Sequence, residues 1–396
     1  MKSRWAIVVV CIIALHGVSE AGAQRKNESS RRRKRTKAIP AKSQRTAVKK
    51  RDAQQLITAA YKLSKTAKNE KSYTAVIDLC RQLLQPTTAK ATKADRSYAK
   101  KLLAWSLNRR GEQRAEKAQK LAEQGKKFTA DKTDELALSD FNAAVKADPT
   151  RWKALHNRGV SLALVGKFSA SVKDFTRVLK LNSEYSNAWF NRAEIRYEMG
   201  QFEAAISDYD HAIKLKPKDV GAILSRGHAY FRLKQYQNAL GDYDKAVRLS
   251  PGNGNAVLNR ADAYHQLQIW ERAAKDFRRA IFLNDRSVRS YQNSAWLMAT
   301  CPDPRYRNSA LAIKAAMRAV ALQGEKPSYQ SLDALAAAYA SHKDFDLARE
   351  TIAKAIQLAP KHKLKPLRLR QKMYLADTEY LQPIRIAGAK SKSSKR

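Results

Sequence analysis

The chain has 396 residues, of which 44% are hydrophobic, so it can bury a sizeable core and is not a wholly disordered protein. Its 77 Lys plus Arg residues against 36 Asp plus Glu residues give a formal net charge of +41, which favours polyanionic partners such as nucleic acid, anionic lipid or acidic protein surfaces. This charge concerns partners and solubility and does not indicate a fold.

Residues 1–23 have the pattern of an export signal. Lys2 and Arg4 precede an apolar run, and the small residues that follow suit cleavage after Ala23. The run is too short for a comfortable membrane span. We therefore expect an exported protein, in the periplasm, the cell envelope or the exterior of a bacterium. The basic run at 31–35 opposes translocation, so an uncleaved N-terminal membrane anchor is the alternative.

Residues 24–52 are predicted to form a disordered basic arm, because they hold almost no large apolar side chains with which to offset the entropy of ordering. Polybasic segments bind anionic polymers through counterion release. Aromatic residues that would stack on bases are absent from this arm, which argues against sequence-specific nucleic-acid binding. The candidate polyanion-binding residues are Arg31, Arg32, Arg33, Lys34 and Arg35.

Residues 53–117 are predicted to form helices of degenerate repeats, and the segment 118–287 that follows repeats with a period of 34 residues. Each repeat shows two helical apolar patterns separated by a turn such as Gly200. A single helical hairpin cannot bury its apolar face, so the units must stack. Three columns carry the period: the aromatics Phe141, Phe175, Tyr209, Tyr243 and Phe277; the small residues Ala144, Val178, Ala212, Ala246 and Ala280; and the aspartates Asp140, Asp174, Asp208, Asp242 and Asp276.

The units "RAEIRYEMGQFEAAISDY" and "RADAYHQLQIWERAAKDF" resemble the tetratricopeptide repeat family, whose 34-residue pattern combines a Trp, a Gly, a Tyr, an Ala, an aromatic and a final Pro. The resemblance implies an all-α solenoid of tandem helix-turn-helix repeats. It continues in residues 288–360, where "CPDPRYRN" at 301–308 is predicted to be a lengthened turn. Residues 361–396 are predicted to be a basic capping helix and a disordered tail.

An arginine stands 16 residues before an aspartate in each of four repeats, and Gly166 and Gly200 lie half-way between the members of the first two pairs. Residues equidistant from the turn of two antiparallel helices lie level with each other. We therefore expect one ion pair to bridge each hairpin, the alternative being independent solvated charges. The expected pairs are Arg158 with Asp174, Arg192 with Asp208, Arg226 with Asp242, and Arg260 with Asp276.

In the family that this chain resembles, the first helices of successive repeats line a concave groove in which peptide or helix segments of other proteins dock. Asparagine amides in such a groove could pair with a partner's backbone, and aromatic rings could anchor it. The alternative is that these side chains contact the neighbouring repeat. The predicted groove residues are Asn157, Phe190, Asn191, Glu194, Tyr197, His228, Phe231, Asn259, Asp262 and His265.

No arrangement of residues indicates an enzyme. There is no Gly-rich phosphate loop, no nucleophile elbow, and no His or Cys pair at metal-ligand spacing, so we expect no catalysis, no cofactor and no metal. Cys80 and Cys301 are interpreted as small buried residues, and His156, His228 and His265 as partly exposed helix residues.

The sequence therefore predicts a non-enzymatic scaffold for protein–protein interaction. The alternative is a protein that binds nucleic acid, acidic polysaccharide or an anionic membrane surface through its basic tails.

Overall fold

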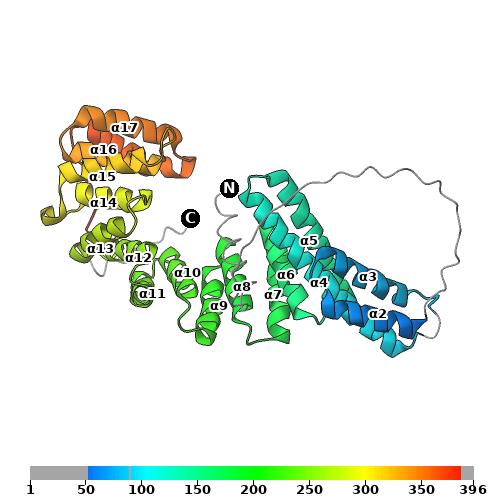
Figure 1. Ribbon diagram of the computed structural model, residues 1–396. Helices are drawn as coiled ribbons and strands as arrows, with labels where there is room; N and C mark the ends of the chain where they lie inside the picture. Colours follow the sequence, from blue (N-terminus) through cyan, green and yellow to red (C-terminus); the bar gives the residue numbers. More distant parts are fainter. Residues whose placement is uncertain (1–51, 89–90, 385–396) are drawn as a thin grey trace, which may run out of the picture. The chain divides into compact units, whose positions relative to one another are not determined.

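The computed structural model of the chain describes residues 52–88 and 91–384 (Figure 1). The predicted export signal, nearly all of the predicted basic arm, and residues 385–396 lie outside these ranges. The described residues form 17 α-helices and two short 3-10 helices, with no strand among them, which confirms the predicted all-α solenoid of tandem hairpins. Within the same ranges, no helix is both long enough and apolar enough to cross a membrane.

The chain divides into two compact units, one ending at Gly200 and the other beginning at Gln201. The helices of the first unit are α2 Ala53–Thr66, α3 Glu70–Leu84, α4 Lys93–Glu123, α5 Lys127–Ala147, α6 Trp152–Leu164, α7 Phe168–Leu181 and α8 Ser186–Glu198. The helices of the second unit are α9 Phe202–Leu215, α10 Val220–Arg232, α11 Tyr236–Leu249, α12 Gly254–Gln266, α13 Trp270–Leu283, α14 Val288–Thr300, α15 Ser309–Ala321, α16 Tyr329–Ser341, α17 Phe345–Leu358 and α18 Leu364–Leu375.

The turn inside most of the hairpins requires a left-handed backbone; the loops between α2 and α3 and between α14 and α15 are the exceptions. Gly166 has φ 75°, and the equivalent positions in later hairpins are Lys234 and Gln268, each with φ 61°. Glycine adopts this region without steric cost, whereas a side chain with a Cβ is strained there. The short loop sets the two helices of each hairpin antiparallel, so positions equally far from the turn residue face each other.

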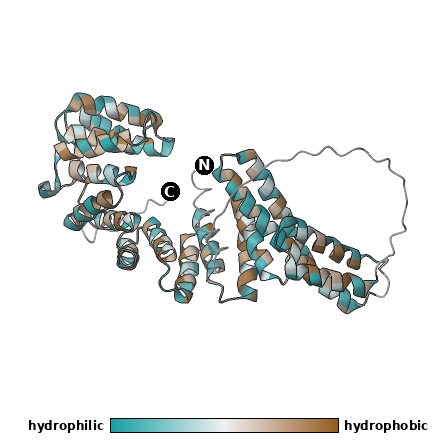
Figure 2. Ribbon diagram, in the orientation of Figure 1, coloured by the Kyte–Doolittle hydropathy of each residue, from teal (hydrophilic) through white to brown (hydrophobic). Residues whose placement is uncertain are grey.

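The core consists of the repeated columns. The five aromatics from Phe141 to Phe277 are all buried, and the five small residues from Ala144 to Ala280 are at most 1% exposed. Figure 2 shows that hydrophobic and hydrophilic residues alternate along the helices. Small residues allow close approach: a Cβ added to Gly227 of α10 would lie 2.6 Å from Cε1 of Tyr243.

Three of the four expected arginine–aspartate pairs are present as bidentate ion pairs, in which two guanidinium nitrogens bond the two carboxylate oxygens. Nε of Arg158 donates to Asp174 at 2.7 Å, Nε of Arg226 to Asp242 at 2.9 Å, and Nε of Arg260 to Asp276 at 2.7 Å. In each pair Nη2 bonds the second carboxylate oxygen. The fourth, Arg192 with Asp208, spans the boundary between the two units and stays a prediction.

Two of these arginines, Arg226 and Arg260, also bond the preceding hairpin. Arg226 Nη1 donates to Asp210 of α9 at 2.6 Å, and Arg260 Nη1 donates to Asp244 of α11 at 3.0 Å. Each of these partners lies 16 residues before its arginine, just as the first partner lies 16 residues after it. One guanidinium therefore closes its own hairpin and stacks it on the one before.

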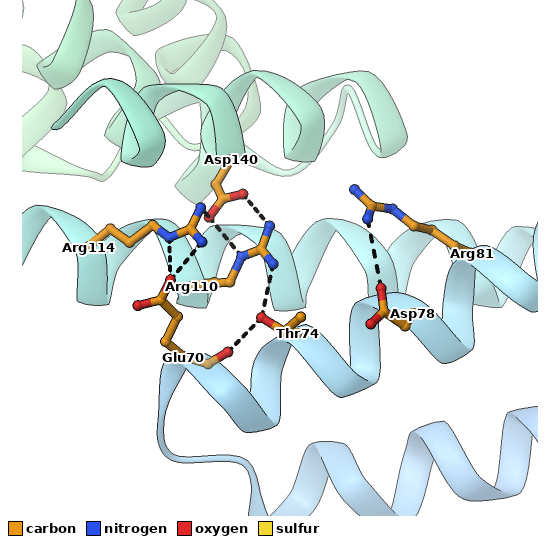
Figure 3. Close-up of polar contacts among 7 residues, drawn as sticks. All are labelled: Glu70, Thr74, Asp78, Arg81, Arg110, Arg114 and Asp140. Atoms are coloured by element: carbon orange, nitrogen blue, oxygen red, sulfur yellow. Dashed lines mark hydrogen bonds and ion pairs between the residues drawn. The ribbon is translucent and has the colours of Figure 1, made fainter. Parts of the chain in front are cut away.

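An equivalent cluster in the first unit was missed by the sequence analysis (Figure 3). Nε and Nη2 of Arg110 on α4 donate hydrogen bonds to Asp140 of α5 at 2.9 and 2.6 Å, and Nη1 donates to Thr74 of α3 at 3.0 Å. Arg114 joins the same Asp140 to Glu70 of α3. Arg110 and Asp140 lie 15 residues on either side of Gly125, which has φ 75°. The equidistance rule would have found this pair if the longer hairpin had been recognised.

Residues 301–308 separate α14 from α15 and include the 3-10 helix Pro304–Tyr306. Asn308 N–H donates to the Met298 carbonyl, which returns the loop to α14. Cys301 directly after α14 and Cys80 in α3 are both fully buried, and burial raises the pKa of each thiol, that of Cys80 to about 12. Both thiols are therefore protonated at neutral pH.

The C-terminal segment differs from the expectation of a disordered tail after the capping helix. Residues 376–384 follow α18 without forming a helix, yet they are held against the second unit by hydrogen bonds, ion pairs and an aromatic contact. The compositional signal for disorder comes from the lysines and serines near the chain end, not from this less basic stretch.

Arg226→Ala is expected to lower the free energy of unfolding by about 3 kcal/mol, because the Asp242 side chain, only 6% exposed, loses its guanidinium partner. Denaturant unfolding of the full chain, followed by circular dichroism, measures the change. Arg248→Ala, which truncates an exposed arginine of α11, is the control and should change stability by less than about 0.5 kcal/mol. Equal stability of the Arg226 variant and the wild type would contradict a structural role for the pair.

Gly227→Ala is expected to destabilise the chain by about 1–3 kcal/mol, because the new methyl group collides with the buried ring of Tyr243. Gly241→Ala on α11 is the matched control, since nothing lies within 4 Å of its added Cβ. This second change should stabilise the helix by up to about 1 kcal/mol. Thermal melting distinguishes the two, and the same direction of shift for both variants would rule out the close approach.

Candidate binding surface

The ten predicted groove residues all lie on first helices: five on α6 and α8 of the first unit, and five on α10 and α12 of the second. We call the side chains at these positions the first-helix surface of each unit. They differ in exposure, which the sequence could not show. Asn157, Asn191, Asn259 and Asp262 are buried, whereas Phe190, Glu194, Tyr197, His228, Phe231 and His265 are half-buried.

The buried amides of the first unit bond to neighbouring helices. Nδ2 of Asn157 donates to Oδ1 of Asn108 and to Oε1 of Glu112, both on α4, at 3.0 Å each. Nδ2 of Asn191 on α8 lies 3.0 Å from Nε2 of His156 on α6. These amides therefore connect successive hairpins, which is the alternative that the sequence analysis left open.

The second unit repeats this arrangement. Nδ2 of Asn259 on α12 lies 2.8 Å from Nε2 of His228 on α10, and Nδ2 of Asn293 on α14 donates to Asp262 on α12 at 2.7 Å. Arg289 of α14 donates to both Asn259 and Asp262. A ladder of satisfied polar contacts thus runs from one first helix to the next beneath the half-buried side chains.

Two histidines in this ladder are neutral at neutral pH. The pKa of His156 is lowered to about 4 by burial, and that of His228 is lowered to about 4 by burial together with the positive charge of Arg289. An unprotonated ring nitrogen accepts the hydrogen bond that each asparagine amide donates. Burial also raises the pKa of Asp262, while Arg289 and Asn293 act in the opposite direction.

The interpretation of His156 as partly exposed is wrong, since the residue is only 3% exposed. Its ring packs edge-on against Phe175 at 5.6 Å and Tyr185 at 5.1 Å between centroids. The neighbouring aromatics come from the second helix of the same hairpin and from the loop before α8, so their convergence was not visible in the 34-residue columns.

Trp296 of α14 is a member of the first-helix surface that is absent from the ten predicted groove residues. It is half-buried and lies 34 residues after Asp262 and 68 after His228, so the repeat period places it in their column. The guanidinium of Arg370 lies 5.1 Å from its ring centroid, a cation–π contact. Extending the repeat period by one more unit, from α12 to α14, would have assigned it.

The chemistry of this surface suits binding. Among the described residues, no group of three or more His, Cys, Asp or Glu side chains is placed to hold a metal ion. The buried asparagine amides beneath the surface are already paired, and the half-buried rings of residues such as Phe231 remain partly open to solvent. The predicted polyanion-binding residues Arg31 to Arg35 lie outside the described residues.

Family models for tetratricopeptide repeats match three stretches of the chain. A model described as a TPR repeat matches residues 193–234, and two described as tetratricopeptide repeats match residues 224–288 and 329–362. These stretches include the hairpins α10–α11, α12–α13 and α16–α17. No curated protein matches the chain.

Several solved structures are similar to the chain in fold. A tetratricopeptide repeat protein from Parabacteroides merdae ATCC 43184 is 20% identical, with 67% of this chain and 98% of that one covered and a TM-score of 0.46. Yeast Tom70 is 16% identical, with 85% and 67% covered and a TM-score of 0.42. YrrB, described as a TPR protein with an unusual peptide-binding site, is 17% identical, with 46% and 89% covered and a TM-score of 0.39.

The first two family matches fall on helical hairpins that carry the aromatic, alanine and aspartate columns, and the third falls on the later hairpin α16–α17. The chain is a tetratricopeptide repeat protein.

Proposed function

We propose that the chain is a non-enzymatic scaffold that binds peptide or helix segments of other proteins on its first-helix surfaces. The observation that carries the proposal is the combination of half-buried aromatic rings, Phe190 and Tyr197 in one unit and Phe231 in the other, with a polar ladder whose members bond one another. Aromatic anchors contribute much of the affinity in protein interfaces.

The polar ladder supports binding for a second reason. Covering a buried polar group that has no partner costs about 1–3 kcal/mol of desolvation. Asn157, Asn191 and Asn259 already bond within the chain, so a partner that covers them removes no hydrogen bond from these amides. The rings can then contribute their apolar burial without that penalty.

The net charge of +41 favours a second candidate, a polyanion-binding function of the basic tails. Deletion of residues 24–51 from the full chain separates the two. Unchanged capture of the partner would exclude the tail model, whereas complete loss of capture would exclude binding on the first-helix surfaces.

We also propose that the scaffold acts outside the cytoplasm, in the periplasm or cell envelope, which rests on the signal pattern of residues 1–23. Amino-terminal sequencing of the protein purified from its own cells tests this. Cleavage after Ala23 is expected, and an intact terminus would favour the membrane anchor.

Photocrosslinking tests the first-helix surfaces directly. Replacing Phe231 by p-benzoylphenylalanine is expected to yield crosslinks to a small set of proteins in cells, because this ring lies in the proposed interface. Phe282 of α13 is the matched control: it is 86% exposed, so random collisions should favour it over Phe231. Mass spectrometry identifies the crosslinked proteins.

A captured protein supports the proposal only if it binds the purified chain and if Phe231→Ala weakens that binding at least tenfold, about 1.4 kcal/mol. Phe282→Ala should leave the affinity within about twofold. The same proteins crosslinked at both positions, or none at Phe231, would contradict the proposal.

A further inference from the structure

The chain reverses direction after α18 and returns along the second unit. Asp377 has φ 50°, and the Thr378 N–H donates to the Met373 carbonyl at 2.9 Å, which ends the helix with a left-handed turn. Arg349 of α17 fixes this turn by donating to the Tyr374 carbonyl and to the Asp377 carboxylate. Residues 378–384 therefore leave α18 in a defined direction.

Residues 378–384 contact three successive hairpins through both backbone and side chains. The Gln382 N–H donates to the carbonyl of Thr300, at the end of α14, at 2.8 Å. Nε2 of Gln268, in the turn between α12 and α13, donates to the Pro383 carbonyl at 3.0 Å. Main-chain contacts of this kind are available to any extended peptide, whatever its side chains.

Two side chains of the segment add selectivity. The Glu379 carboxylate lies 3.7 Å from Arg307, in the lengthened turn 301–308, and 3.7 Å from Lys343, in the turn between α16 and α17. The Tyr380 ring lies 5.9 Å from Trp296, with the Arg370 guanidinium 5.4 Å from its centroid. The acidic Glu379 thus lies near two cationic side chains. The aromatic residue that follows it, Tyr380, lies near a tryptophan ring and a guanidinium.

The attachment of this segment is weaker than that of the helix before it. Leu367 and Tyr374 of α18 are almost fully buried, and Arg370 grips Asp333 of α16 with two hydrogen bonds. In the segment, by contrast, Leu381 and Ile384 are exposed. Both ion pairs of Glu379 are longer than a hydrogen bond and partly solvated. Few buried contacts indicate a low cost of local opening, so the segment can detach while α18 stays in place.

We infer that Gln268, Trp296, Thr300, Arg307 and Lys343 form a binding strip for extended peptides that carry an acidic residue followed by an aromatic one, and that residues 378–384 are its resident ligand within the chain. A partner peptide binds by displacing this segment. The inference rests on the proposed scaffold function and names a partner class for it. It also gives the lengthened turn a role, because that turn presents Arg307.

A labelled peptide with the sequence of residues 377–384, DTEYLQPI, tests the strip by fluorescence anisotropy. The full chain with Glu379→Ala and Tyr380→Ala, which weakens the resident segment, is expected to bind this probe at least tenfold more tightly than the wild type. Adding Arg307→Ala and Lys343→Ala to that variant should remove the gain, as should replacing Glu and Tyr of the probe by Ala. These four positions are partly exposed, and circular dichroism verifies that the variants fold.

Hydrogen exchange at the Gln382 amide gives an independent measurement. Its protection in the wild type should fall when excess probe is added, while protection within α14 persists. If the probe binds the wild type and the Glu379→Ala/Tyr380→Ala variant with equal affinity, or binds neither, the inference is overturned. If the wild type is a dimer and the Glu379→Ala/Tyr380→Ala variant is a monomer, the strip binds the tail of a second copy of the chain. This result would also overturn the inference. Crosslinking at Phe231 is independent of all these outcomes, so the scaffold proposal can survive the failure of this one.

Discussion

The structure depends on buried aspartates in the second helices of its repeated hairpins and on the arginines that meet them. Taking a carboxylate out of water is costly, and the cost is offset only when a guanidinium satisfies both oxygens. Asp174, Asp242 and Asp276 are each satisfied in this way. Because the arginine must lie level with the aspartate, the pair permits only one register between the two helices. A shift of one residue would leave the buried carboxylate without its guanidinium partner.

This register extends from one hairpin to the next. Arg226 and Arg260 use their remaining nitrogen for an aspartate of the hairpin before, so the pairing that closes a repeat also orients it on its neighbour. The ladder of Asn259 with His228 and Asn293 with Asp262 then joins successive first helices. The positions of the surface side chains that a partner would contact are consequently determined by the hydrogen bonds beneath them. The half-buried rings therefore lie on helices whose relative placement within a unit is fixed.

The sequence was sufficient to predict whatever the 34-residue period carries. It specified the hairpins, the buried columns and the pairing of Arg226 with Asp242, because each depends only on spacing from a turn. It did not separate the buried Asn191 from the half-buried Phe190 beside it, since the exposure of neighbouring positions is decided by the packing of adjacent repeats. Nor did it find the contact of Arg110 with Asp140, because the hairpin of α4 and α5 is longer than the period.

The last hairpin shows why the C-terminal segment lies where it does. Leu335 and Thr351 stand equidistant from Lys343, so α16 and α17 lack the usual ion pair. The carboxylate of this hairpin is Asp333, and its guanidinium comes from Arg370 of α18. Because a guanidinium is planar, Arg370 can pair with Asp333 along its edge and lie near the rings of Trp296 and Tyr380 at its faces. The cap helix thus supplies the missing pair and, through the same side chain, a place for the residues that follow it.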